Sequence, residues 1–102
     1  MPRPLGISSL RILAALRDGS RYGIDLVAHT GLPSGTVYPT LGRLTRRGMV
    51  ASKWEDQRIA EREGRPRRRY HQLTPAGAAA LAEGVARYRG LTAALDPEAD
   101  GA

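Results

Sequence analysis

The sequence contains no cysteine and no phenylalanine, and it has one tryptophan and two histidines among its 102 residues. Because there is no thiol, a disulfide framework and a thiolate metal site are both excluded. His29 and His71 stand far apart in the chain, so a zinc centre is not expected and no cofactor is predicted. The carboxylates form no pattern with a histidine or a nucleophile, and no Walker-type glycine loop occurs, so no enzyme is predicted.

Long apolar runs are also missing from the sequence. No stretch approaches the roughly 20 residues of a membrane-spanning helix, and no signal-peptide pattern opens the chain, so we expect a cytoplasmic protein. Positive charge is in excess, with 16 lysines and arginines against 10 acidic residues and a net charge of +6. This balance favours a polyanionic partner, either nucleic acid or an anionic membrane surface. The positions of the arginines decide between these two.

The stretch from residue 22 to residue 50 predicts two helices joined by a tight turn. The first helix is expected over about 22–29, with Ile24, Leu26 and Val27 as its apolar residues. The sequence Thr-Gly-Leu-Pro then interrupts the pattern. A short turn that contains glycine between two helices is typical of a helix-turn-helix.

The second helix of this pair is expected over about Gly35–Arg47, with Ser34 as its N-cap. Val37, Leu41 and Leu44 fall on one stripe at helical spacing and form its buried side. The other side has no acidic residue; it carries Tyr38, Pro39, Gly42, Arg43 and Arg46, with Thr36 and Arg47 at its margin. Arginines pair with phosphates or guanine edges, so this side suits a major groove, although a basic surface helix has the same pattern.

Pro39 is unusual at its position inside this helix. It removes a backbone donor and crowds the preceding turn, so we expect a bent or 3₁₀-like first turn, or a later start of the helix. Tyr38 precedes the proline and is therefore biased away from ideal helical geometry. This bias could turn its ring outward.

The N-terminal residues 1–6 contain two prolines and are expected to form an arm. A helical pattern starts at Ile7 and ends at Asp18-Gly19-Ser20, where a glycine suits the left-handed conformation that follows a helix. We expect this helix to support the helix-turn-helix pair.

Two alternating segments follow the helix-turn-helix and predict a wing. Residues 49–55 alternate with a period of two, and residues 67–73 do so again, whereas 57–66 is polar and without periodicity, so it is interpreted as a loop. The run GRPRRR at 64–69 suits the minor groove of A·T-rich DNA or its phosphates. A solvated loop of mixed charge is the alternative, and the position beside the second helix favours DNA.

The C-terminal helix is predicted to start at Thr74-Pro75, with threonine as the cap and proline at the first helical position. Its apolar positions repeat at intervals of four and three, like a coiled-coil seam. A second copy could pack on this seam, or the helix could fold back on its own domain; we favour the dimer. The seam consists of Leu81, Val85, Tyr88, Thr92 and Leu95.

In combination, YGIDL, GLPSGTVYPTLGRLTRRGMV, a strand with tryptophan and GRPRRRYHQLTPAGAAAL resemble the PadR family of winged helix-turn-helix transcriptional regulators. The resemblance covers roughly residues 5–81. It implies a mainly α fold with a two-stranded β wing (α+β), and a dimeric repressor on a palindromic operator. It also implies dimerisation through the C-terminal helix and a small, commonly aromatic effector, whose pocket Trp54 could line.

Three parts of the chain are expected: a winged DNA-binding domain (1–74), a dimerisation helix (75–95) and a disordered tail (96–102). The resemblance implies that Tyr38 contacts DNA, that Ser34 and Thr36 hold phosphates, and that the wing contributes arginines. The full set of predicted DNA contacts is Ser34, Gly35, Thr36, Tyr38, Pro39, Arg43, Arg46, Arg47, Lys53, Arg65 and Arg67.

The leading interpretation is therefore a sequence-specific repressor whose partners are double-stranded DNA and a second copy, with a possible aromatic effector and no membrane. The alternative is a dimeric protein-interaction adaptor that uses the winged domain without specific DNA binding. An RNA-binding role ranks last, because the sequence offers no exposed aromatic platform for stacking single-stranded bases.

Overall fold

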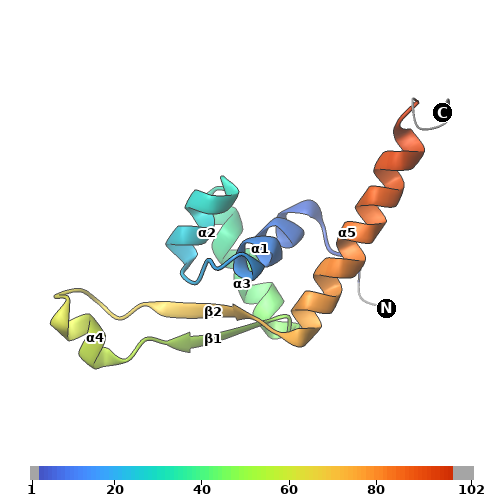
Figure 1. The fold of residues 1–102 in the computed structure, drawn as a ribbon. Helices are drawn as coiled ribbons and strands as arrows, with labels where there is room; N and C mark the ends of the chain where they lie inside the picture. The colour runs from blue at the N-terminus through green and yellow to red at the C-terminus, as the bar shows by residue number, and fades with distance from the viewer. Residues whose placement is uncertain (1–2, 98–102) are drawn as a thin grey trace.

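The computed structural model describes residues 3–97, which form five helices and a two-stranded antiparallel sheet. Figure 1 shows α1–α3 as a cluster, the hairpin of β1 and β2 reaching out to one side, and α5 projecting at the other end. The predicted mainly helical fold with a two-stranded wing is confirmed. The elements are α1 (Ile7–Arg17), α2 (Gly23–Thr30), α3 (Ser34–Arg46), β1 (Val50–Trp54), α4 (Gln57–Arg62), β2 (Arg69–Leu73) and α5 (Pro75–Leu95).

The core lies where α1, α2 and α3 meet. Leu13 of α1, Leu26 of α2 and Val37 of α3 are completely buried there. The predicted stripe of α3 is confirmed, since Leu41 and Leu44 are buried as well. Ile24, by contrast, lies exposed on the outer side of α2 and is not part of this core.

The turn between α2 and α3 is held by polar contacts at the end of α2. Gly31 adopts a left-handed φ of 71°. The hydroxyl of Thr30 donates to the carbonyl of Leu26 at 2.6 Å and accepts from the amide of Leu32 at 3.1 Å. The guanidinium of Arg11 in α1 also donates to the carbonyl of Thr30. These bonds fix the direction in which α3 leaves the turn.

The start of α3 differs from the prediction. Pro33 occupies the cap position with an extended backbone, and Ser34 is already helical, so the prediction of Ser34 as N-cap is wrong. The helix begins at Ser34, one residue before the predicted start, and continues through Pro39, so the alternative of a later start is wrong. A 3₁₀-type bond from the Thr36 amide to the Pro33 carbonyl, at 2.9 Å, is present in the first turn, as expected.

The hairpin pairs Val50 with Leu73 at its base and Trp54 with Arg69 at its outer end. The predicted loop at 57–66 is wrong over its first part, where α4 forms. Asp56 caps this short helix by accepting from the Arg58 amide at 2.9 Å. Figure 1 shows this helix at the tip of the hairpin, between β1 and β2.

The first half of α5 packs on its own chain. The predicted start is confirmed, since the hydroxyl of Thr74 accepts from the Gly77 amide at 3.0 Å. Leu81 is buried in the core of its own chain, so little of its side chain is left for the predicted dimer seam. A Cβ at Gly84 would collide with Leu10 of α1, and this explains why glycine stands at the crossing of the two helices.

The segment before α1 is anchored to α5. Leu5 belongs to the core, and its carbonyl accepts from the guanidinium of Arg87 at 2.7 Å. Within residues 3–97 no helix has the length and apolar character needed to cross a bilayer. Of the predicted disordered tail, residues 98–102 lie outside the described residues.

A candidate nucleic-acid interface

The outer face of α3 is open to solvent. The side chain of Tyr38 is 52% exposed, and Arg43 and Arg46 are exposed on the same side of the helix. The predicted division of α3 into an apolar stripe and a basic outer face therefore holds. Thr40 was not foreseen as a core residue, yet it is buried, and its hydroxyl accepts from the guanidinium of Arg43 at 3.0 Å.

The ring of Tyr38 lies directly over the backbone of Gly23, the first residue of α2. A Cβ built on Gly23 would lie 2.8 Å from Cζ and 2.9 Å from the hydroxyl oxygen of that ring. Only glycine lets the ring lie this close to α2. Sequence reasoning missed this contact, because the two residues belong to different helices and Gly23 looks like an ordinary helix start.

The first turn of α3 presents small and polar residues. Ser34, Gly35 and Pro39 are exposed, and Thr36 is half-buried. Since Ser34 is not the N-cap, its hydroxyl is not used to cap the helix. Free amides at a helix start attract anions, so this turn suits a phosphate oxygen. Arg47 follows the helix and is exposed as well.

The wing, defined here as residues 50–73, carries arginines on both of its faces. On one face the guanidinium carbons of Arg67 and Arg69 lie 5.6 and 5.8 Å from the ring centroid of Trp54. Trp54 is 57% exposed, so it serves as an open platform for these cations. The suggestion that Trp54 lines an effector pocket stays a prediction.

The opposite face of the wing meets α2. The rings of Tyr22 and Tyr70 lie 5.1 Å apart, and the guanidinium of Arg68 lies 5.0 Å from the Tyr22 ring. Arg68 and Arg69 are exposed cations that the list of predicted contacts omitted. Their signal was present in the GRPRRR run, whose alternation places them on opposite faces. Lys53, which was predicted, is exposed on β1 opposite Tyr70.

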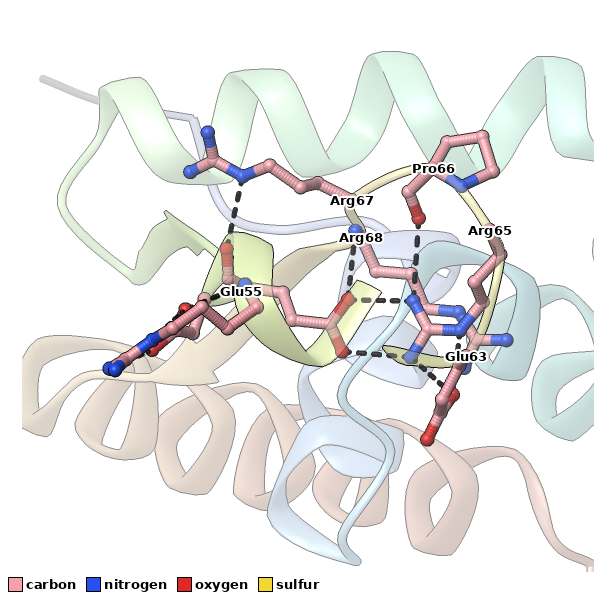
Figure 2. Close-up of polar contacts among 8 residues, drawn as sticks. Glu55, Glu63, Arg65, Pro66, Arg67 and Arg68 are labelled. Atoms are coloured by element: carbon pink, nitrogen blue, oxygen red, sulfur yellow. Dashed lines mark hydrogen bonds and ion pairs between the residues drawn. The ribbon is translucent and has the colours of Figure 1, made fainter. Parts of the chain in front are cut away.

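Arg65, one of the predicted DNA contacts, points into the wing. Figure 2 shows its guanidinium turned inward onto the carboxylate of Glu55, which is 1% exposed. The two nitrogen–oxygen distances are 2.6 and 2.9 Å, and a further contact of 2.9 Å joins Arg65 to Glu63. The hydrogen bonds from Arg65 hold the pKa of the Glu55 carboxyl below its usual range, against the opposing effect of burial. Arg65 is therefore already paired within the wing.

His71 connects the wing to α3. It is buried in β2, and its Nδ1 lies 2.8 Å from the hydroxyl of Ser52 in β1. That hydroxyl lies 3.4 Å from Thr45 of α3, so three elements meet in one polar row. Burial, with a smaller effect from nearby Arg69, lowers the pKa of His71 below its ordinary value.

A groove of about 590 Å³ runs between α1 and α5, away from this basic surface. Its walls are almost entirely apolar, and every residue of the predicted seam except Leu95 borders it. The groove is lined by Ile7, Leu10, Arg11, Ala14, Leu81, Val85, Tyr88, Arg89, Thr92, Ala93 and Asp96.

A model of the PadR-like family of transcriptional regulators matches residues 12–83, which is more than half of the chain. The chain belongs to this family. The matched range contains the whole helix-turn-helix, the wing and the first part of α5. Because the family consists of transcriptional regulators, the PadR-like chain is a regulator and not an enzyme.

Solved structures share the PadR-like fold. BpsR of Bordetella bronchiseptica, whose DNA binding is regulated by 6-hydroxynicotinic acid, is 26% identical, with a TM-score of 0.71 over 98% of this chain and 75% of BpsR. A PadR family regulator of Eggerthella lenta is 29% identical, with a TM-score of 0.67 over 82% and 73% of the two chains. One from Clostridium difficile, 22% identical, is similar in fold, with a TM-score of 0.74 over 85% and 92%. No match was found among curated protein sequences.

Proposed function

We propose that this PadR-like regulator is a repressor that binds a palindromic operator in double-stranded DNA as a dimer. The observation that carries this proposal is the exposed, acid-free face of α3 beside a wing covered with arginines. In a winged helix-turn-helix, the recognition helix enters the major groove and residues near its start reach base edges. Tyr38 is placed to read a base, while Arg43, Arg46 and Arg47 contact phosphates or guanine edges.

The wing supplies the second half of the proposed contact. Arg67 and Arg69 on its Trp54 face, with Lys53 on β1, add positive charge to the wing. Cations of this kind neutralise phosphates and release counterions, so the affinity should fall steeply with salt. The relation to BpsR, a protein with regulated DNA binding, supports the same function.

The groove between α1 and α5 is proposed as the dimer interface. The outer half of α5 extends beyond the helical cluster (Figure 1). It exposes Leu91 and Leu95, the latter at 72%. An apolar helix face that extends past its own domain is suited to a second copy of the same face. The proposed seam is therefore Val85, Tyr88, Thr92 and Leu95, without Leu81. Two copies would present two α3 helices to two half-sites.

Selection from random duplexes tests the DNA-binding proposal. We expect an inverted repeat with half-sites about one helical turn apart. Tyr38→Ala should weaken binding to the selected sequence far more than binding to an unrelated duplex. Equal loss on both would remove Tyr38 from the base-reading role. If no duplex is enriched and no mobility shift occurs, while a protein partner is retained, the adaptor function replaces the repressor.

Light scattering tests the dimer on its own. Leu95→Asp places a charge in the proposed seam, and because Leu95 is exposed, the domain should remain folded. We expect a monomer that binds one half-site weakly. Ala94→Asp is the matched control, since it adds the same charge to the neighbouring exposed residue and should leave the dimer intact. A wild-type monomer at working concentrations would contradict the proposed interface.

A further inference from the structure

The wing contains a buried carboxylate where DNA binding would favour none. Glu55 follows β1 directly and is almost fully enclosed, although it belongs to a strongly basic segment. A lone negative charge at this place would be costly to bury and would repel phosphates. Its pairing with Arg65 removes both problems, because the planar guanidinium bonds both carboxylate oxygens at once (Figure 2).

Glu55 also holds the backbone of the GRPRRR run. Its amide donates to the Arg68 carbonyl at 2.8 Å, and its Oε1 accepts from the Arg68 amide at 3.4 Å. Its own carbonyl accepts from Nε of Arg67 at 3.1 Å. One residue therefore contacts three arginines of the run, two of them through main-chain atoms.

Arg65 makes further hydrogen bonds within the wing. One of its terminal nitrogens donates to the Pro66 carbonyl at 3.3 Å, and its Nε donates to the carboxylate of Glu63 at the end of α4. Its side chain is only 20% exposed. The positive charge of Arg65 is therefore neutralised by ion pairs within the wing, whereas Arg67, Arg68 and Arg69 are exposed to solvent.

We propose that the Glu55–Arg65 pair is the positioning element of the wing, and that Arg65 is not a DNA contact. The pair fixes the chain after Pro66, so that Arg67 and Arg69 stack on Trp54 and Arg68 turns to the Tyr22 face. The arginines that meet DNA are then held in place before binding, which lowers the entropy lost on association. This inference rests on the proposed DNA-binding function and adds the residues that shape its wing.

The direction in which one substitution changes DNA affinity distinguishes a positioning role of Arg65 from a direct contact. Glu55→Gln removes a negative charge from a DNA-binding surface and leaves Arg65 unpaired. If Arg65 were a contact, the freed guanidinium and the lost repulsion would strengthen binding. Positioning predicts the opposite, a loss of roughly tenfold in affinity as the wing arginines lose their order. Glu61→Gln is the matched control, since it neutralises an exposed carboxylate of the same wing and should leave the affinity equal or slightly higher.

Arg65→Lys gives a second readout. A lysine keeps the positive charge and still reaches a phosphate, but it cannot make the bidentate pair with Glu55. Positioning therefore predicts that Arg65→Lys weakens binding about as much as Glu55→Gln, and that the double variant is no weaker than either, because both break one pair. Near wild-type affinity for Arg65→Lys would assign Arg65 to the phosphates.

Hydrogen exchange of the free protein, far below its unfolding temperature, makes the test independent of DNA. In Glu55→Gln and in Arg65→Lys, amide protection should fall at residues 65–69 while α1 and α3 keep theirs. Protection at 65–69 that matches the wild type in both variants would overturn the inference, even if no operator were found. If wild type fails to bind any duplex but exchange changes as expected, the proposed function fails and the positioning of the wing stands.

Discussion

Gly23→Ala should separate the stability of this protein from its recognition of DNA. The new methyl group would lie 2.8 Å from Cζ of Tyr38, too close for the present ring position. Holding the ring there would cost about 1–3 kcal/mol of overpacking. The ring is half exposed, however, and turning it away costs only about 0.5–1.5 kcal/mol. Alanine returns up to about 1 kcal/mol through helix propensity. The free energy of unfolding should therefore change by at most about 1.5 kcal/mol.

DNA affinity should respond much more strongly to the same methyl group. A displaced Tyr38 ring loses its base contact, and such contacts are worth about 1–3 kcal/mol, or roughly 5- to 150-fold in Kd. Urea unfolding gives the stability, and fluorescence anisotropy on the selected operator gives the affinity.

A double-mutant cycle identifies the cause. In a Tyr38→Ala background the methyl group at position 23 meets no ring, so Gly23→Ala should then leave the affinity unchanged and raise stability slightly. If Gly23→Ala lowers affinity equally in both backgrounds, the methyl group acts through α2 and not through Tyr38, and the reasoning is refuted.

Three further predictions concern the helix, the wing and pH. Gly77→Ala should destabilise the fold by about 1–3 kcal/mol in urea unfolding, because its Cβ would strike the Met49 backbone, whereas Gly90→Ala, with open space among the described residues, should stabilise it by up to about 1 kcal/mol. Trp54→Ala should leave stability nearly unchanged but weaken operator binding several-fold, since two arginines lose their platform; unchanged binding would show that the stacking is incidental. Burial lowers the pKa of His71 in the folded protein below its ordinary value of 6.5. Between the pKa of the folded state and that of the unfolded state, the unfolded chain binds a proton that the folded chain does not. The free energy of unfolding should therefore fall as the pH drops below about 6.5. His71→Asn should flatten that dependence in denaturation curves at fixed protein concentration.

The long helices followed from the sequence because their patterns are repeated over several turns. Val37, Leu41 and Leu44 mark one side of α3 whatever the surrounding fold, so both the stripe and the opposite basic face were predictable. The first residue of the helix was harder to predict, since serine caps helices well, whereas here Pro33 with an extended backbone occupies the cap position and Ser34 is already helical.

The wing shows where local patterns stop being informative. Four of the six residues of α4 are polar, and its main signal, Asp56 before Gln57, is shared with many turns. The pairing of Arg65 could not be predicted, because nothing in its neighbourhood in the sequence reveals that Glu55, ten positions earlier, is buried beside it. A run of arginines reports positive charge, but it does not tell which of them the fold itself neutralises.

The seam of α5 shows a different limit. Its heptad-like spacing predicts an apolar helix face but cannot distinguish packing within the chain from packing between chains. The structure divides the seam: Leu81 is buried against α1, while Leu95 is exposed at the far end. Gly84, which weakens the helix as an isolated residue, allows the close crossing with Leu10.

Hydrogen exchange of the wild-type protein with and without its selected operator tests the central claim most directly. If the outer face of α3 and the arginines of the wing bind the duplex, new protection should appear at residues 34–47 and 65–69, and it should weaken as salt increases. Protection confined to α1 and α5, with residues 34–47 unchanged, would contradict the account.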